Sequence, residues 1–127
     1  EAAAKERMER TIAFQQSHHA WLVVEKESGK AIGFAGLREE SGVCEDTGIA
    51  VGPRYVGKGY GTEILNELVR IAKEGLNAHG FIATCRSENE ASRRMILGCG
   101  FRFSHAEPRV DKRNGEKYTL EFYRKEI

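Results

Sequence analysis

The chain has no long hydrophobic run, no excess of charge of one sign and few cysteines, and each of these absences argues against particular classes of protein. Its 127 residues include 20 basic and 19 acidic side chains, for a net charge of +1, so no bulk electrostatic field draws it to nucleic acid or an acidic membrane. No stretch of about 18 apolar residues is present, and the opening EAAAK is not a secretion signal. We therefore expect a cytoplasmic protein that binds neither nucleic acid nor a membrane.

Cysteine and histidine are too scarce and too widely spaced to predict a metal site. Cys44, Cys85 and Cys99 form no Cys-x-x-Cys pair, which argues against zinc and against a disulfide framework. The four histidines lack a spacing such as His-Glu-x-x-His. We expect no metal, and cysteines that pack as small apolar side chains.

The hydrophobic pattern predicts one domain over residues 1–127 with an α+β fold. Helices are predicted at 1–17, at 62–78 and, after a Ser87/Glu90 capping box, up to about residues 98–100. Strands are predicted at 20–26, 31–38, 43–51, 81–85, 101–104 and 118–123, with an interruption at Pro108 and a hairpin turn at Asn114-Gly115. This order indicates a mixed, mostly antiparallel sheet flanked by helices.

A glycine-rich stretch before the second predicted helix concentrates the chemistry. It reads VGPRYVGKGYGT over residues 51–62, with glycine at 57, 59 and 61. Glycine lets backbone N–H groups approach a ligand with no Cβ in the way. The N–H groups and positive dipole end of the following helix favour a phosphate, and Lys58 adds positive charge. The stretch therefore predicts an anion site.

Two nucleotide motifs fail to match this stretch. A P-loop would run from Gly52 to Lys58, but Gly59 stands where a Ser or Thr must hold magnesium. A dinucleotide fingerprint that starts at Gly57 needs its third glycine where Thr62 stands. These two motifs do not identify the anion, and a third candidate rests on the resemblance of two segments to a known family.

Two segments carry a family resemblance: DTGIAVGPRYVGKGYGTE over residues 46–63 and NEASRRMILGCGF over residues 89–101. They resemble the GNAT acetyltransferase superfamily, and most closely its branch of ribosomal-protein N-acetyltransferases of the RimJ/RimL kind, which implies the pyrophosphate of coenzyme A as the anion. They occur in the family's order and spacing. The similarity covers about residues 20–101, and the closing hairpin is compatible with it.

The resemblance implies that acetyl-CoA is the cosubstrate and lies in a gap between the strand before the glycine loop and the strand after the long helix. Main-chain groups would bind the pantetheine arm, the loop would bind the pyrophosphate, and residues of the second segment would complete the site. The implied residues are Ile49, Ala50 and Val51 for the arm, Gly57, Lys58, Gly59, Tyr60, Gly61 and Thr62 for the pyrophosphate, and Asn89 and Ser92 in the second segment. For Asn89, the alternative is a helix cap.

Three features depart from the family pattern. Val56 stands where a Gln or Arg is usual, and Ile96 replaces the tyrosine that protonates the departing thiolate in many members. Apolar residues also occupy the latter position in the RimJ/RimL branch. The sequence shows no counterpart of the strand and helix that usually precede the first predicted helix, so we expect either a shortened chain or a reduced GNAT domain without them.

The expected activity is transfer of the acetyl group to a primary amine, either a protein N-terminus or a small molecule, by direct attack. An amine of pKa about 8–10 is mostly protonated at neutral pH, so a base must accept a proton. Asp46 aligns with an acidic position common in the branch, and the alternative is a solvated strand carboxylate. A backbone N–H near Ile49 or Ala50 is the expected oxyanion donor. A non-catalytic acyl-CoA-binding module is the alternative function, and a homodimer is an open alternative for the assembly.

Overall fold

The protein forms one seven-stranded mixed sheet with two main helices, the α+β arrangement that the sequence predicted. The computed structural model describes residues 6–15 and 18–127, with side chains described from residue 18 onward. The strands are β1 (Glu6–Gln15), β2 (His18–Glu25), β3 (Ala31–Glu40), β4 (Val43–Val51), β5 (Gly80–Arg86), β6 (Arg102–Val110) and β7 (Lys117–Glu126). The helices are α1 (Tyr60–Arg70) and α2 (Glu90–Gly98), with a short 3-10 turn η1 (Pro53–Tyr55) and a π-helical turn η2 (Ile71–Gly75).

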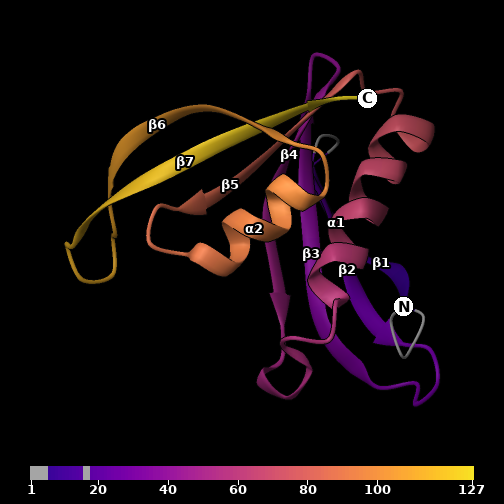
Figure 1. Ribbon diagram of the computed structural model, residues 1–127. Helices are drawn as coiled ribbons and strands as arrows, with labels where there is room; N and C mark the ends of the chain where they lie inside the picture. The colour runs from indigo at the N-terminus through magenta and orange to yellow at the C-terminus, as the bar shows by residue number, and fades with distance from the viewer. Residues whose placement is uncertain (1–5, 16–17) are drawn as a thin grey trace.

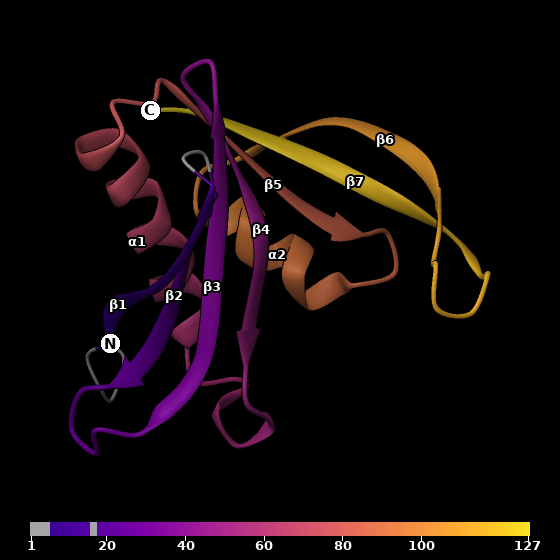
Figure 2. The same cartoon turned by 180° about the vertical axis from the view of Figure 1, so that it is seen from behind.

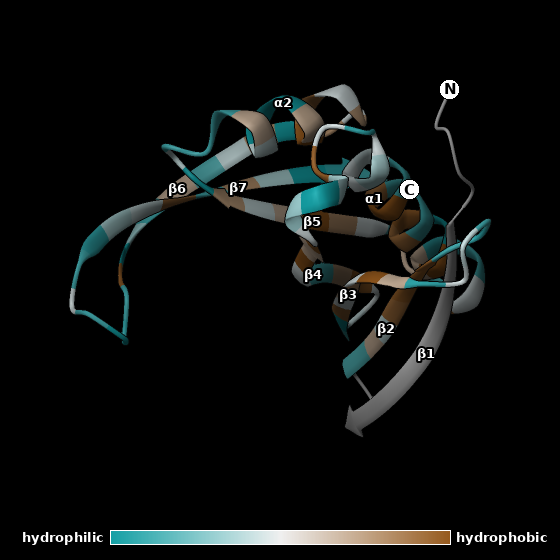
Figure 3. Ribbon diagram, turned by 90° about the horizontal axis from the view of Figure 1, so that it is seen from below, coloured by the Kyte–Doolittle hydropathy of each residue, from teal (hydrophilic) through white to brown (hydrophobic). Residues whose placement is uncertain are grey.

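The strands follow the order β1-β2-β3-β4-β5-β7-β6, and β4 with β5 is the parallel pair among antiparallel ones. That parallel pairing is short: it joins Val43–Glu45 to Gly80–Ile82, and the rest of the two strands diverge. Figures 1 and 3 show the result, with β5, β7 and β6 turned away from β2, β3 and β4. The sheet therefore opens as a V between its two central strands.

Both helices lie on one face of the sheet, and the core lies between them and the strands (Figure 1). The apolar stripe predicted for α1 packs inward, since Ile64, Leu65 and Leu68 are at most 1% exposed. Phe81 on β5 and Phe101 meet edge-to-face beneath the helices, with ring centroids 5.9 Å apart. Figure 2 shows the opposite face of the sheet, which no helix of the described residues covers. All three cysteines are free and buried, as predicted.

The helix predicted at residues 1–17 is wrong for the part that the structure describes, because residues 6–15 form β1. This strand pairs antiparallel with β2 from Glu6↔Glu25 to Gln15↔His18. Met8 and Ile12 satisfy a helical spacing, but Met8, Ile12 and Phe14 also fit a two-residue period. Backbone pairing along β2 selects the strand, although register shifts between Arg10 and Ile12 and between Ile12 and Gln15 interrupt that period. Residues 1–5 and 16–17 lie outside the described residues.

The other predicted elements are present with shifted ends. The helix predicted at 62–78 begins at Tyr60, and its regular part ends at Arg70 before η2. The last helix is capped by Asn89, whose Oδ1 accepts a hydrogen bond from the Ser92 N–H at 3.1 Å, so the predicted Ser87/Glu90 capping box is wrong.

The closing hairpin extends further than predicted. Strand β6 runs through Pro108 instead of stopping there. It is an edge strand, where proline is tolerated because no further strand needs its missing N–H. The Asn114-Gly115 turn is confirmed between β6 and β7, with Gly115 at a φ of 74°.

Candidate active site

Asp46 lies at the point where β4 and β5 separate. Its neighbour Glu45 belongs to the last paired position of the two strands, opposite Ile82. One residue further on, Asp46 Oδ2 accepts a hydrogen bond from the backbone N–H of Thr84 at 3.0 Å. The carboxyl group thus replaces a strand-to-strand backbone bond at the apex of the V.

The environment of Asp46 favours its neutral form. Burial raises the pKa of this carboxyl to about 7, and the charge of Glu45 acts in the same direction. Backbone N–H groups of Thr84 and Gly48 lower it, but they do not compensate for lost hydration. A carboxyl with a pKa near neutrality exchanges protons readily at physiological pH. Glu45, by contrast, pairs with Arg38 at 2.6 Å on the outer surface.

Past the apex, β4 presents backbone groups to the gap. The Gly52 N–H donates to the Ile32 carbonyl on β3 at 2.7 Å. Because bonding direction alternates along an antiparallel strand, Ala50 also faces β3, whereas Ile49 and Val51 direct their N–H and C=O groups away from it. Strand β5 has already diverged there. Of the three residues expected along this edge, the structure brings Ile49 and Val51 to the gap and turns Ala50 toward β3.

The glycine loop leads into the N-terminus of α1. Gly57 and Gly59 both have φ of 84°, and a Cβ added to either would meet no atom within 4 Å, so the backbone is open on that side. The first bond of the helix runs from the Glu63 N–H to the Gly59 carbonyl at 3.2 Å. The N–H groups of Gly61 and Thr62 precede it and have no acceptor within the helix. Together with the helix dipole, they are oriented to accept an anion.

Tyr60 fixes this loop to the sheet. Its ring is 2% exposed, and its hydroxyl donates to Glu25 Oε2 at the end of β2 at 2.6 Å. Tyr60 therefore serves as an anchor for the loop rather than as part of its surface. The Lys58 amino group lies 5.7 Å from the centre of the Tyr55 ring, on the exposed side of the loop.

Two adjoining cavities connect the loop to Asp46. The first, which we name the apex cavity, has a volume of about 440 Å³ and contains Asp46 in its wall. The second, the loop cavity, has about 280 Å³ and is lined by the glycine loop. Five residues line both: Val51, Val56, Gly61, Ser92 and Met95. The two spaces therefore form one groove from the anion site to the apex.

Ser92 and Asn89 have different positions relative to this groove. Ser92 lines both cavities at the first turn of α2. Asn89 lies outside both linings, and its amide oxygen caps the helix. The geometry thus gives Asn89 the capping arrangement that was its alternative at the sequence level. Asn89 therefore affects the groove indirectly, because its amide oxygen holds the backbone of Ser92.

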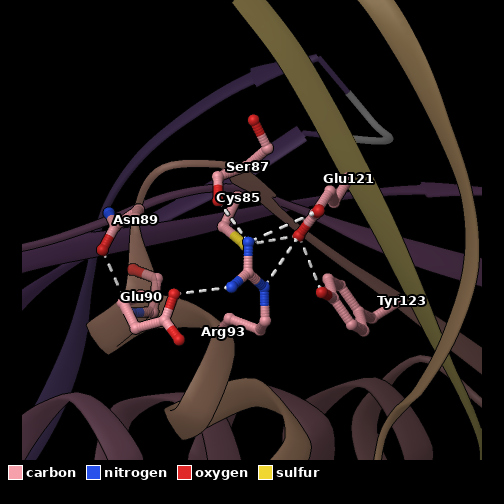
Figure 4. A network of polar contacts seen from close by, with 8 residues as sticks. Cys85, Ser87, Asn89, Glu90, Arg93, Glu121 and Tyr123 are labelled. Atoms are coloured by element: carbon pink, nitrogen blue, oxygen red, sulfur yellow. Dashed lines mark hydrogen bonds and ion pairs between the residues drawn. The ribbon is translucent and has the colours of Figure 1, made fainter.

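A polar network holds this turn of α2 against β7 (Figure 4). Arg93 bonds Glu121 through Nε at 3.1 Å and Glu90 through Nη1 at 2.7 Å, and it also donates to the Ser87 carbonyl. The Tyr123 hydroxyl donates to the same Glu121 carboxylate at 2.8 Å. These bonds link helix, preceding loop and strand, and so fix the wall of the groove.

Several residues of the apex cavity were not predicted from the sequence. Besides Asp46, Ile49 and the five residues shared with the loop cavity, its wall includes Thr47, Gly48, Leu65, Ala83, Thr84, Cys85, Arg86, Ile96 and Leu120. The polar side chains of Thr84 and Arg86 at the end of an otherwise apolar strand were the available signal. Ile96, the position at which the resemblance leads one to expect a tyrosine acid in many family members, is 2% exposed. Among the described residues, no three His, Cys, Asp or Glu side chains gather to hold a metal ion.

Comparison with known proteins identifies the family. An acetyltransferase (GNAT) domain profile matches residues 1–102, and the chain therefore belongs to the GNAT acetyltransferase family, whose cosubstrate is acetyl-CoA. No curated protein matches the sequence. In the part of the chain that the structure describes, no helix is long and apolar enough to cross a membrane.

Solved structures share the fold at low sequence identity. An IAA acetyltransferase from Bacillus cereus superposes with a TM-score of 0.79 at 20% identity, over 97% of this chain and 100% of that one. A dodecameric spermidine N-acetyltransferase from Vibrio cholerae gives 0.78 at 19%, over 88% of this chain and 66% of that one. A GNAT-family acetyltransferase from Bacillus anthracis gives 0.75 at 21%, over 84% and 65%. The chain spans about two thirds of the length of the latter two.

Proposed function

We propose that this acetyltransferase moves the acetyl group of acetyl-CoA to a primary amine in the groove between β4 and β5, with Asp46 as the base. The observation that carries the proposal is the continuity of the groove. An anion site at the N-terminus of α1 opens into a cavity that ends at a carboxyl group with a pKa of about 7. This continuity supports pyrophosphate binding at the glycine loop and proton transfer at the apex, at the two ends of one groove.

The residues fit the cosubstrate in three respects. The open backbone at Gly57 and Gly59 leaves room for a phosphate, and the helix start supplies N–H donors. The free edge of β4 at Ile49 and Val51 offers the main-chain groups that an extended amide-containing arm can bind as an added strand. The Ser92 hydroxyl lines the junction of the two cavities, where it can donate a hydrogen bond to the same arm.

At the apex, the acetyl thioester supplies the electrophilic carbon. Asp46 in its ionised form takes the proton of the attacking amine while the C–N bond forms and the C–S bond breaks. That proton returns to the departing sulfur or to water, so that an amide and a thiol are the products. The Ile49 N–H, directed into the gap, is the proposed donor to the carbonyl oxygen, and its orientation favours it over the Ala50 N–H, which faces β3.

A thiol-release assay with acetyl-CoA against a library of amino acids, polyamines and peptides with free N-termini tests this proposal. We expect amine-dependent release and an acetylated product of matching mass. Acceptor peptides would place the chain with the RimJ/RimL branch, and small amines would place it elsewhere in the family. Binding of acetyl-CoA with no release for any acceptor would overturn the proposed activity and leave a binding module.

A further inference from the structure

The apex cavity contains a fixed cation as well as a base. Arg86 lies on β5 two residues beyond Thr84, the residue whose N–H holds Asp46, and it lines the cavity together with its cross-strand partner Leu120. Two residues along a strand span about 6–7 Å, which is the backbone spacing of Thr84 and Arg86. Asp46 and Arg86 both line the apex cavity, so a molecule held there can contact both side chains.

Two contacts hold the Arg86 guanidinium in place. It lies over the Tyr118 ring, 3.8 Å from the ring centre, and its Nη2 bonds Asp111 Oδ2 at 2.8 Å. Only about a third of the side chain is exposed. A planar fork held in this way loses little conformational freedom when it binds an anion, which favours tight binding.

Asp111 does not fully neutralise the charge of Arg86. The Asp111 carboxylate also accepts three hydrogen bonds from Arg113, through its backbone N–H, Nε and Nη2. These bonds, with the one from Arg86, hold the pKa of Asp111 far below its usual range. One carboxylate between two guanidinium groups leaves a net positive charge. The bond to Asp111 also occupies only one nitrogen of a group that has five N–H donors.

Other carboxylates on this side of the sheet already have arginine partners. Glu45 pairs with Arg38 at 2.6 Å, and Glu107 pairs with Arg109 at 2.8 Å. Neither pair lines the apex cavity. The cavity itself therefore combines the titratable Asp46 with the cationic Arg86.

We infer that the acceptor is a small amine that also carries an anionic group, a carboxylate or a phosphonate, which Arg86 binds while the amine faces Asp46. This inference rests on the proposed function and names its substrate class. A guanidinium pairs with such oxyanions through two parallel hydrogen bonds. A polyamine would instead bring a second cation toward Arg86, and a peptide N-terminus would offer it no anion.

The test compares matched acceptors in the thiol-release assay with acetyl-CoA. Each amino acid is measured beside its amide and beside its decarboxylated amine, with rates corrected for the neutral fraction of each amine. We expect kcat/KM to be about 10- to 100-fold higher for the acid than for either neutral analogue, the range typical of a lost hydrogen bond to a charged group. Equal or better rates with the amides, with spermidine or with a peptide would overturn the inference while leaving the acetyl transfer established.

Arg86→Gln should remove this preference, and Arg109→Gln is the matched control. Arg109 also pairs with a carboxylate and lies 5.6 Å from an aromatic ring centre, that of Phe122, but it is not part of the cavity wall. We expect the acid-to-amide ratio to fall toward one in the first variant and to stay unchanged in the second. A retained ratio in folded Arg86→Gln protein would assign the preference to another residue and refute the role of Arg86.

A binding measurement on the wild-type protein keeps the inference testable if Arg86→Gln fails to fold. With saturating CoA, an N-acetyl amino acid should raise the melting temperature more than its amide does, because mass action stabilises the folded state by whichever product binds more tightly. Equal shifts would contradict the inference. Absence of any shift with CoA itself would instead contradict the proposed function.

Discussion

Replacement of Asp46 by asparagine should make the protein more stable at alkaline pH while it removes the base. The raised pKa, about 7 against an ordinary 3.8, corresponds to about three units. At about 1.4 kcal/mol per unit, the ionised carboxylate costs the fold up to about 4 kcal/mol. An asparagine amide is uncharged, and its oxygen can still accept the Thr84 N–H that Asp46 accepts at 3.0 Å.

The sign of the pH dependence follows from proton binding. Between about pH 4 and pH 7 the folded state binds more protons at Asp46 than the unfolded state does, so the free energy of unfolding falls as pH rises and then levels off. The Asp46→Asn variant lacks this fall. The two proteins should therefore be similarly stable near pH 4, and the variant should be more stable at pH 8, by up to about 4 kcal/mol.

Urea unfolding at pH 5, 6, 7 and 8 measures this difference. The single tryptophan, Trp21, is 8% exposed and reports on the core by its fluorescence. If wild type and variant showed parallel stability across this range, the carboxyl of Asp46 would not have a raised pKa, and the reasoning would fail.

The same variant should lose turnover. A positioned base contributes about 10²- to 10⁴-fold, so kcat should fall by that order while acetyl-CoA affinity stays near wild type. The deficit should shrink at higher pH, where more of the acceptor amine is already neutral. Glu45→Gln is the control: Glu45 pairs with Arg38 outside the apex cavity, and its charge contributes to the raised pKa of Asp46. Activity should persist in this control. The rising limb of its pH–rate profile should move to slightly lower pH, because loss of the Glu45 charge lowers the pKa of Asp46.

Three further predictions concern the walls of the groove. In Gly61→Val, an added Cβ would lie 2.8 Å from Met95 Sδ. Both residues line the groove, so the valine side chain and the displaced methionine should change its shape, and we expect at least about a tenfold loss of acetyl-CoA affinity by calorimetry. Tyr60→Phe removes the 2.6 Å bond to Glu25 and should lower the melting temperature and raise KM for acetyl-CoA, with kcat retained at saturation. Asn89→Ala should destabilise the fold by about 1 kcal/mol in urea, because the helix loses its cap.

Matched variants separate these effects from general damage. Gly98→Val introduces the same side chain at the end of α2, where an added Cβ meets nothing within 4 Å, and should leave acetyl-CoA affinity unchanged. Asn89→Asp preserves an oxygen acceptor at the cap and should keep stability near wild type. A loss of affinity in Gly98→Val equal to that in Gly61→Val would refute the role assigned to Met95. If Tyr60→Phe lowered kcat by a factor ten times larger than the factor by which it raised KM, an anchoring role would be contradicted.

Much of the fold was readable from the sequence because turns mark its boundaries. Strand β4 occupies the predicted residues 43–51, since Gly42 precedes it and Gly52-Pro53 follows it. The N-terminal segment was misread because its apolar residues fit both a helical and a two-residue period, and only pairing with β2 decides between them. Asn89 and Ser87 are both good caps, and backbone geometry, which local sequence does not specify, selects Asn89.

The candidate site was readable in part for a similar reason. The glycine loop is contiguous in sequence, so an anion site there could be predicted from the sequence alone. The apex is not, because Asp46 meets Thr84 across 38 positions, and the point at which β4 and β5 separate depends on how the two halves of the sheet twist apart. Arg86 was missed for the same reason, since its place in the cavity follows from that separation.

Calorimetric titration of acetyl-CoA into the wild type and into Gly59→Val tests the central claim, that the groove from the glycine loop to Asp46 holds the cosubstrate. Gly59 has a φ of 84°, which a branched residue rarely adopts, and its backbone borders the loop cavity. We expect saturable heat for the wild type and none, or at least about a 100-fold weaker affinity, for a variant that circular dichroism shows to be folded. No heat with the wild type at millimolar acetyl-CoA, or unchanged affinity in the folded variant, would contradict the account.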